Sequence, residues 1–339
     1  MVFMKYFSCC RERMAELECV PLVCLIIWND GKMMIKRNSE VSMRKRTYLP
    51  MILFIILLIS LVGIYFVLDY GIVGVEKSTT VTRIQSVKAP VKVHYIDIGQ
   101  GDSIFMEVSG KNILIDAGEQ EHADTIIEYL KTYDVNRLDL VFLTHPHEDH
   151  IGGMGDVLSA FEIGEFYAPD KELVTKSFIR MTTALDDKKI PRKMLKGGME
   201  FEFGESISLQ ILSPNRDTYL NPNNYSPIMR LVVGLNAFLF TGDAEELIET
   251  EVIRTAKELK SDVLKAPHHG SKTSSSEAFL EKVAPDYIVV TSGLGNDHNL
   301  PSPEILERYE AIGAKTLLTE EMGSIVFAAN GREVIPLTN

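Results

Sequence analysis

The chain has 339 residues, of which 45% are hydrophobic and 24% are charged, and its formal net charge is −12. The charge is uneven, because residues 91–339 carry 23 Lys+Arg and 40 Asp+Glu, a net charge of −17. A surface this acidic repels polyanions, which speaks against tight binding of a long nucleic acid over most of its area.

The N-terminal 48 residues are predicted to be a cytoplasmic segment. All four cysteines lie in it, at Cys9, Cys10, Cys19 and Cys24, with spacings that match neither a zinc site nor a disulfide framework. A second potential start, Met43, begins the segment MRKRTYLP. Two interpretations stay open: residues 1–42 are a short cytoplasmic extension, or they belong to a mis-assigned start.

Residues 49–68 read LPMILFIILLISLVGIYFVL and contain no charge. This length is close to the ~20 residues that cross a bilayer, which favours a transmembrane helix over a buried core helix. Basic residues precede the span at 44–46, and Asp69 follows it. The positive-inside rule therefore places the N-terminus in the cytoplasm and the remainder outside the cell membrane. An uncleaved anchor is favoured over a signal peptide, because no convincing cleavage site follows.

Residues 69–90 are predicted to be a linker. From residue 91 onward, the pattern of apolar and polar residues predicts one α/β domain that spans 91–339. VKVHYIDIG, SIFMEV and KNILIDAG predict strands, ADTIIEYLKTY predicts a helix, and LDLVFLTH reads as a strand buried on both faces. Further strands are predicted at SISLQILSP, SPIMRLVVGLNAFLFTGD, SDVLKAPHHG, PDYIVVTSG, AKTLLTE and GSIVFAAN, with helices at AEELIETEVIRTAKEL, SSEAFLEKV and SPEILERYEAIG. This order predicts two mixed sheets packed face to face with helices outside.

The segment THPHEDHIGG, residues 144–153, follows the buried strand and carries the pattern His-x-His-x-Asp-His. Loops after the carboxyl ends of such strands are where active sites of α/β folds lie. His145 and His147 can face one metal ion, while Asp149 and His150 can face a second. Imidazole and carboxylate ligands together suit zinc, with manganese as the alternative.

Two other segments offer the remaining ligands. Asp243 in FTGD ends another apolar strand and can bridge two ions, while His268 and His269 follow the next strand. Adjacent residues of an extended chain point to opposite sides, so one histidine should complete the second site, with a slight preference for His268. The other would donate to a ligand or contact substrate.

LIDAG, THPHEDHIGG, FTGD and HHGS, in this order, resemble the metallo-β-lactamase superfamily. The resemblance implies a four-layer αββα sandwich. DIGQGDS, NNYS, FTGDAE and LKAPHHGSKTSS resemble the hydrolase domain of ComEC-type DNA-uptake (competence) proteins and its stand-alone relatives, over about residues 91–328. Carried over, Asp116 would organise the histidine loop by hydrogen bonding, and Asp102 would lie near the rim of the metal site.

Two departures from the superfamily pattern stand out. The usual third histidine for the first metal is missing, and Asn223, Asn224 and Ser226 stand where it might fall, as in ComEC-type domains. Relatives also show His-Pro where this chain has Leu300 and Pro301; His298 lies two residues earlier. Lys272 is a candidate contact for a substrate anion or a neighbour of a helix cap. We expect Asn223, Asn224, Ser226 and Lys272 to support the metal ligands by hydrogen bonding or to contact substrate. We expect His298 to be unliganded.

Two cations close together lower the pKa of a shared water and polarise the bond under attack, so the expected reaction is hydrolysis. Catalysis would centre on Asp149 and Asp243. The first expected activity is that of a phosphodiesterase or nuclease, with single-stranded nucleic acid as a partner. The alternatives are a hydrolase of a small ester, cell-envelope phosphoester, lactone or β-lactam, and a catalytically silent binding module.

Overall fold

The computed structural model describes residues 26–29, 32–35 and 90–338, and the chain divides into two units, residues 1–75 and 76–339. In the first unit, β1 (Ile26–Asn29) and β2 (Lys32–Ile35) pair antiparallel as a hairpin that the sequence did not predict. The predicted span 49–68 and nearly all of the linker lie outside the described residues. Within the described ranges, no helix combines the length and apolarity needed to cross a membrane.

The second unit contains two β-sheets. The first has eight strands in the order β17-β16-β3-β4-β5-β6-β7-β8. In chain order its strands are β3 (Val91–Tyr95), β4 (Ile104–Val108), β5 (Lys111–Ile115), β6 (Arg137–Phe142), β7 (Glu162–Ala168), β8 (Arg192–Met194), β16 (Ile325–Ala329) and β17 (Val334–Pro336). Neighbours from β5 to β8 run parallel and the others antiparallel, so the sheet is mixed, as predicted.

The second sheet has seven strands in the order β15-β14-β13-β12-β11-β10-β9. They are β9 (Glu200–Glu202), β10 (Ile207–Ile211), β11 (Met229–Val233), β12 (Asn236–Phe240), β13 (Val263–Lys265), β14 (Tyr287–Val290) and β15 (Lys315–Leu318). The apolar segment 226–243 is not one strand but the hairpin β11–β12, since Gly234 turns the chain with a φ of +59°.

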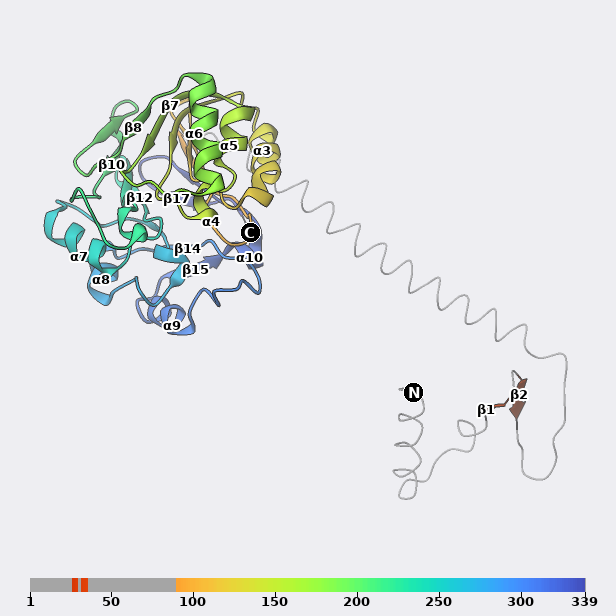
Figure 1. Ribbon diagram of the computed structural model, residues 1–339. Coiled ribbons are helices and arrows are strands. Elements are labelled where there is room, and N and C mark those ends of the chain that lie inside the picture. Colours follow the sequence, from red (N-terminus) through yellow and green to blue (C-terminus); the bar gives the residue numbers. More distant parts are fainter. Residues whose placement is uncertain (1–25, 30–31, 36–89, 339) are drawn as a thin grey trace. The chain divides into compact units, whose positions relative to one another are not determined.

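Helices cover the outer face of each sheet (Figure 1). On the first sheet lie α3 (Ala123–Thr132), α5 (Met154–Ala160) and α6 (Lys176–Lys188); on the second lie α7 (Glu246–Thr255), α8 (Glu277–Val283) and α9 (Pro303–Ala311). The short α4 (Glu148–Ile151) and α10 (Thr319–Met322) complete the described α-helices. The predicted αββα order is therefore confirmed for residues 90–338.

The alternation along β4 explains how the layers separate. Ile104, Met106 and Val108 point between the two sheets, where they pack in one core with Phe238 of β12. Phe105, one position out of phase, belongs instead to the core under the helices of the first sheet. A strand's period of two thus divides its apolar residues between two cores, which fixes the register of the strand in the sandwich.

Candidate metal centre

The ends of strands from both sheets meet around the carboxylate of Asp243. This residue follows β12 and is 2% exposed. Its Oδ1 lies 3.2 Å from Nε2 of His150 and 3.2 Å from Nε2 of His269. Its Oδ2 lies 3.6 Å from Nε2 of His145 and 3.7 Å from Nε2 of His268. Residues separated by more than a hundred positions therefore converge on one carboxyl group, as the sequence predicted.

Four of these residues form a compact group that could hold a metal ion. One ligand atom from each of Asp149, His150, Asp243 and His269 lies within 4.8 Å of the others. His269 belongs to this group and His268 does not, so the geometry favours His269, and not the preferred His268, as the partner of Asp149 and His150. The reason is local: the two histidines lie in a tight turn, η3 (Pro267–Gly270), and not on an extended strand.

The other two histidines of the motif form a second corner of the site. Nε2 of His145 lies 3.0 Å from Nδ1 of His147, and His145 is fully buried while His147 is half-buried. Ser226 Oγ lies 3.3 Å from Nδ1 of His145 and accepts the backbone N–H of Asp243 at 3.1 Å. This hydroxyl therefore links the histidine loop to the carboxylate, a supporting role that fits the expectation for Ser226.

Asp116 binds the histidine loop as expected. It is fully buried after β5, and its carboxylate accepts the backbone N–H of Thr144 at 2.7 Å and the Thr144 hydroxyl at 2.6 Å. The same group lies 2.8 Å from Nδ1 of His150. A carboxylate on Nδ1 orients the ring, so that Nε2 is the nitrogen that would bind a metal ion once it has lost its proton.

Asp102 lies behind the site and not at its rim, which corrects the expectation. It is 1% exposed, and its Oδ2 lies 2.8 Å from Nζ of Lys265, which is fully buried at the end of β13. Its Oδ1 accepts the Thr291 hydroxyl at 2.6 Å. Lys265 was not singled out from the sequence, although a lysine inside the apolar run SDVLKAP is an available signal, since lysine is almost never fully buried without a partner.

The remaining predicted residues differ in their exposure: the two asparagines are largely buried, whereas Lys272 and His298 are exposed. Asn223 is nearly buried, with Nδ2 3.4 Å from Nε2 of His268, and its Oδ1 accepts no hydrogen bond. Asn224 forms hydrogen bonds with the backbone N–H and the side chain of Glu245. Lys272 pairs with Glu304 at 3.2 Å on the surface. His298 is exposed and, among the described residues, belongs to no group that could hold a metal ion.

Charge in the site is strongly coupled. Burial opposes the charged form of His150, but the carboxylates of Asp243, Asp149 and Asp116 outweigh it and raise its pKa well above the usual range. The pKa of His269 rises to about 9, since Asp243 and Asp149 outweigh burial and the nearby Lys265. Burial and the proximity of His150 lower the pKa of His145 well below its usual value. The group of Asp149, His150, Asp243 and His269 thus attracts positive charge.

These residues fit a divalent metal ion. Asp243 Oδ1 is buried and has no assigned hydrogen bond, although Nε2 of His150 and Nε2 of His269 each lie 3.2 Å away. The two Nε2 atoms of these histidines lie only 3.4 Å apart. A bound cation would accept lone pairs from all these atoms at once, and an imidazole and carboxylate set of this kind is typical of zinc and related divalent metals.

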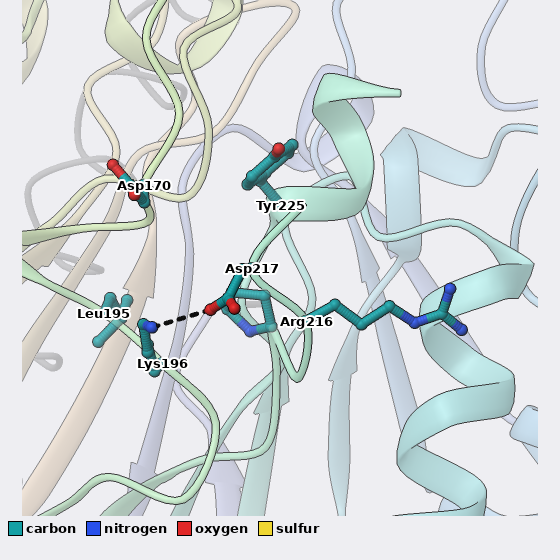
Figure 2. A pocket seen from close by; sticks show the side chains of 7 residues that line it. Asp170, Leu195, Lys196, Arg216, Asp217 and Tyr225 are labelled. Atoms are coloured by element: carbon teal, nitrogen blue, oxygen red, sulfur yellow. Dashed lines mark hydrogen bonds and ion pairs between the residues drawn. The ribbon is translucent and has the colours of Figure 1, made fainter. Parts of the chain in front are cut away.

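A small pocket of about 250 Å³ opens beside Tyr225, in η2 (Pro222–Tyr225), next to the asparagines of the site (Figure 2). Its basic residues are already paired: Lys196 binds Asp217 at 3.1 Å, and the Arg216 side chain extends away toward Glu251. Asp170 adds a further acidic group to its wall. The pocket therefore does not provide the basic groove that a long polyanion would need.

Comparison with known families decides the classification. Residues 96–292 match the family model of the metallo-β-lactamase superfamily. The chain belongs to the metallo-β-lactamase superfamily. The matched region includes the histidine loop, Asp243, and the pair His268 and His269.

Its curated relatives include competence proteins. The chain is 27% identical to ComE operon protein 3 of Bacillus subtilis over 71% of its own length and 33% of that protein. It is 31% identical to competence protein ComA of Neisseria gonorrhoeae, covering 68% of this chain and 31% of ComA. Recombination protein 2 of Haemophilus influenzae is 30% identical, over 68% of this chain and 28% of that protein. The chain thus spans about a third of the length of these metallo-β-lactamase relatives, and the ComEC-type resemblance is confirmed.

Among solved structures, the metallo-β-lactamase fold protein YhfI from Bacillus subtilis superimposes with a TM-score of 0.49 at 14% sequence identity. The alignment covers 71% of this chain and all of YhfI. Igni18, a metallo hydrolase from Ignicoccus hospitalis, gives a TM-score of 0.47 at 18% identity, covering 70% of this chain and 99% of Igni18.

Proposed function

We propose that this protein is a hydrolase that uses two divalent metal ions to cleave phosphodiester bonds. Zinc is the preferred metal, and manganese is the alternative. The observation that carries the proposal is the position of Asp243, whose two carboxylate oxygens face two different sets of imidazoles. When bound, two such ions supply a hydroxide at neutral pH and stabilise charge on the group under attack.

The residues of the chain would divide the remaining work. Asp149 is the least buried carboxylate of the compact group, with 22% of its side chain exposed, so it can hold a water molecule on the open side. His147 and His268 are both half-buried, so their side chains are available to orient a phosphodiester beside the group of Asp149, His150, Asp243 and His269. Asn223 Oδ1, in contrast, is buried and accepts no hydrogen bond.

The names of three relatives, which refer to competence and recombination, favour a nucleic-acid substrate. The net charge of −17 over residues 91–339 and the paired cations near the site favour a smaller one. We infer that the substrate is a short single strand or a small phosphodiester. Small esters, cell-envelope phosphoesters, lactones and β-lactams form the second candidate class, favoured by the same acidic surface.

Residues 49–68 are proposed to anchor the protein in the cell membrane, with the catalytic domain outside the cytoplasm. The uncharged 20-residue run and the basic residues before it support this orientation. Protease added to intact spheroplasts should digest residues 91–339 and spare a cytoplasmic control protein. Protection of the domain until the membrane is lysed would refute the orientation.

Substrate class is tested by offering the purified full-length protein bis(p-nitrophenyl) phosphate, p-nitrophenyl acetate, a chromogenic cephalosporin and labelled single-stranded DNA, each with Zn²⁺ or Mn²⁺. We expect hydrolysis of the phosphodiester, lost in Asp149→Asn and retained in His298→Asn, an exposed histidine outside the cluster. Turnover of only the acetate or cephalosporin would move the protein to the second class. Metal binding without turnover of any of the four substrates would favour a silent binding module.

A further inference from the structure

The pair His268 and His269 has an unusual backbone conformation. Their φ angles are +48° and +52°, so two consecutive residues other than glycine are left-handed. Each such residue carries a strain of about 1–3 kcal/mol, which persists only where the surrounding structure enforces it. The turn is followed by Gly270 at +81°, where an added Cβ would lie 2.7 Å from Cβ of Pro301. The chain is therefore held in a tight turn at this point.

This turn has a direct consequence for the two imidazoles. On an extended strand they would point to opposite sides, but here both face Asp243. Nε2 of His269 lies 3.2 Å from Oδ1, and Nε2 of His268 lies 3.7 Å from Oδ2. The two neighbouring histidines thus address the two different oxygens of one carboxylate.

Each oxygen of Asp243 has a histidine from the 144–153 loop on its other side. His150 faces Oδ1 at 3.2 Å, and His145 faces Oδ2 at 3.6 Å. In each half of the site, one carboxylate oxygen lies near one histidine of the loop and one of the pair. Among the described residues, only the Oδ1 half forms a group whose ligand atoms all lie within 4.8 Å of one another. Asp149 belongs to the Oδ1 half, and His147, 3.0 Å from His145, belongs to the Oδ2 half.

The ring nitrogen of His268 that faces away from Asp243 is held as in the other three histidines. His150 has Asp116 at Nδ1, His269 has the Thr291 carbonyl at 2.7 Å, and His145 has hydroxyl groups. Nδ1 of His268 lies 3.0 Å from the Thr273 hydroxyl and 3.8 Å from Glu245. Oxygen partners on the distal nitrogen are the usual support of a metal-binding histidine.

The Oδ2 half is also the half that lacks a histidine of the superfamily pattern. Asn223 and Ser226 occupy that stretch, and Asn223 lies 3.4 Å from His268. We propose that His268 replaces the missing ligand, so that the first ion is held by His145, His147, His268 and Asp243 Oδ2. The second ion is held by Asp149, His150, His269 and Asp243 Oδ1. Both members of the pair are ligands, one for each ion.

This assignment rests on the proposed metal dependence and not on the substrate. It is tested by equilibrium titration of the full-length protein with Co²⁺, with bound metal counted by mass spectrometry. The variants are His268→Asn and His269→Asn, because asparagine tolerates a left-handed φ, with the exposed His298→Asn as the matched control. Circular dichroism verifies that each variant folds.

We expect two bound ions in the wild type and in His298→Asn. His268→Asn should keep one tight ion and bind the other on the order of 100-fold more weakly, the upper end of the loss seen for metal-site changes. Adding Asp149→Asn to His268→Asn should remove both. In His268→Gly, free imidazole should restore binding of the first ion, which a purely structural role of His268 does not predict.

Two results would overturn the assignment. One is a His268→Asn protein that binds two ions with the affinity of the wild type. The other is a double variant Asp149→Asn/His268→Asn that still holds one ion tightly, since both residues would then serve the same ion. Loss of the first ion in His268→Asn without any phosphodiester hydrolysis by the wild type would refute the proposed function alone.

Discussion

The ammonium group of Lys265 lies 2.8 Å from Oδ2 of Asp102, and both side chains are buried directly behind the candidate metal centre. The pair connects Lys265 at the end of β13 to Asp102 in the loop after β3. Asp102 also accepts a hydrogen bond from the Thr291 hydroxyl, and its backbone N–H donates to the Asp149 carbonyl. Two strand ends from different sheets are thereby held together where the ligands converge.

Breaking this pair should destabilise the fold. Lys265→Met leaves the Asp102 carboxylate buried without its cation, a change that costs about 3–5 kcal/mol in comparable buried pairs. Urea denaturation should show this loss, while Lys282→Met, at an exposed lysine of α8, should change stability by less than about 0.5 kcal/mol. A Lys265→Met protein as stable as the Lys282→Met control would show that the pair contributes no stability.

Binding of metal at pH 7 should release about two protons. His150 and His269 have raised pKa values, so both imidazoles are protonated in the metal-free site and must lose a proton to bind a metal ion. Asp243 and His145, whose pKa values are lowered, are already ionised and neutral respectively and release none. Calorimetric titrations in buffers of different ionisation enthalpy measure the number, and a buffer-independent enthalpy would contradict it.

Gly101 allows the loop after β3 to contact Asp149. Its φ is +120°, and an added Cβ would lie 2.3 Å from the Asp149 carbonyl oxygen. Gly101→Ala should therefore displace Asp149, weaken metal binding and lower stability by about 1–3 kcal/mol beyond the cost of the backbone strain. Gly110→Ala is the matched control, because Gly110 also has a positive φ but has nothing within 4 Å of the new Cβ. Equal effects of the two changes on metal affinity would exclude the steric explanation.

Asp116→Asn should weaken metal binding by about 10–100-fold without unfolding the protein. The substitution keeps the shape and the left-handed backbone at φ +58° but removes the negative charge from Nδ1 of His150. Asp134→Asn, at an exposed aspartate with φ +57°, controls for the backbone conformation. Metal affinity measured with a competing chelator reports the effect, and an unchanged affinity would remove Asp116 from the support of the site.

Most of the fold follows from the sequence, because alternation along strands such as β4 and the apolar end of β6, residues 141–142, report burial directly. The approach of Asp243 to the histidine loop follows from the rule that strand ends gather functional residues. The orientation of His268 and His269 could not be predicted from the sequence, since it depends on a left-handed turn that no local sequence pattern indicates. The burial of Asp102 depends on Lys265, a partner 163 positions away that only the folded chain reveals.

The central claim is that one carboxylate, Asp243, joins two metal ions. The most direct measurement is the number of divalent ions bound by the purified full-length protein and by its Asp243→Asn variant, determined by mass spectrometry after dialysis against buffer containing Zn²⁺. The geometry predicts two ions in the wild type and weakened binding of both in the variant. A wild-type protein that retains no ion, or a variant that retains both, would contradict the account.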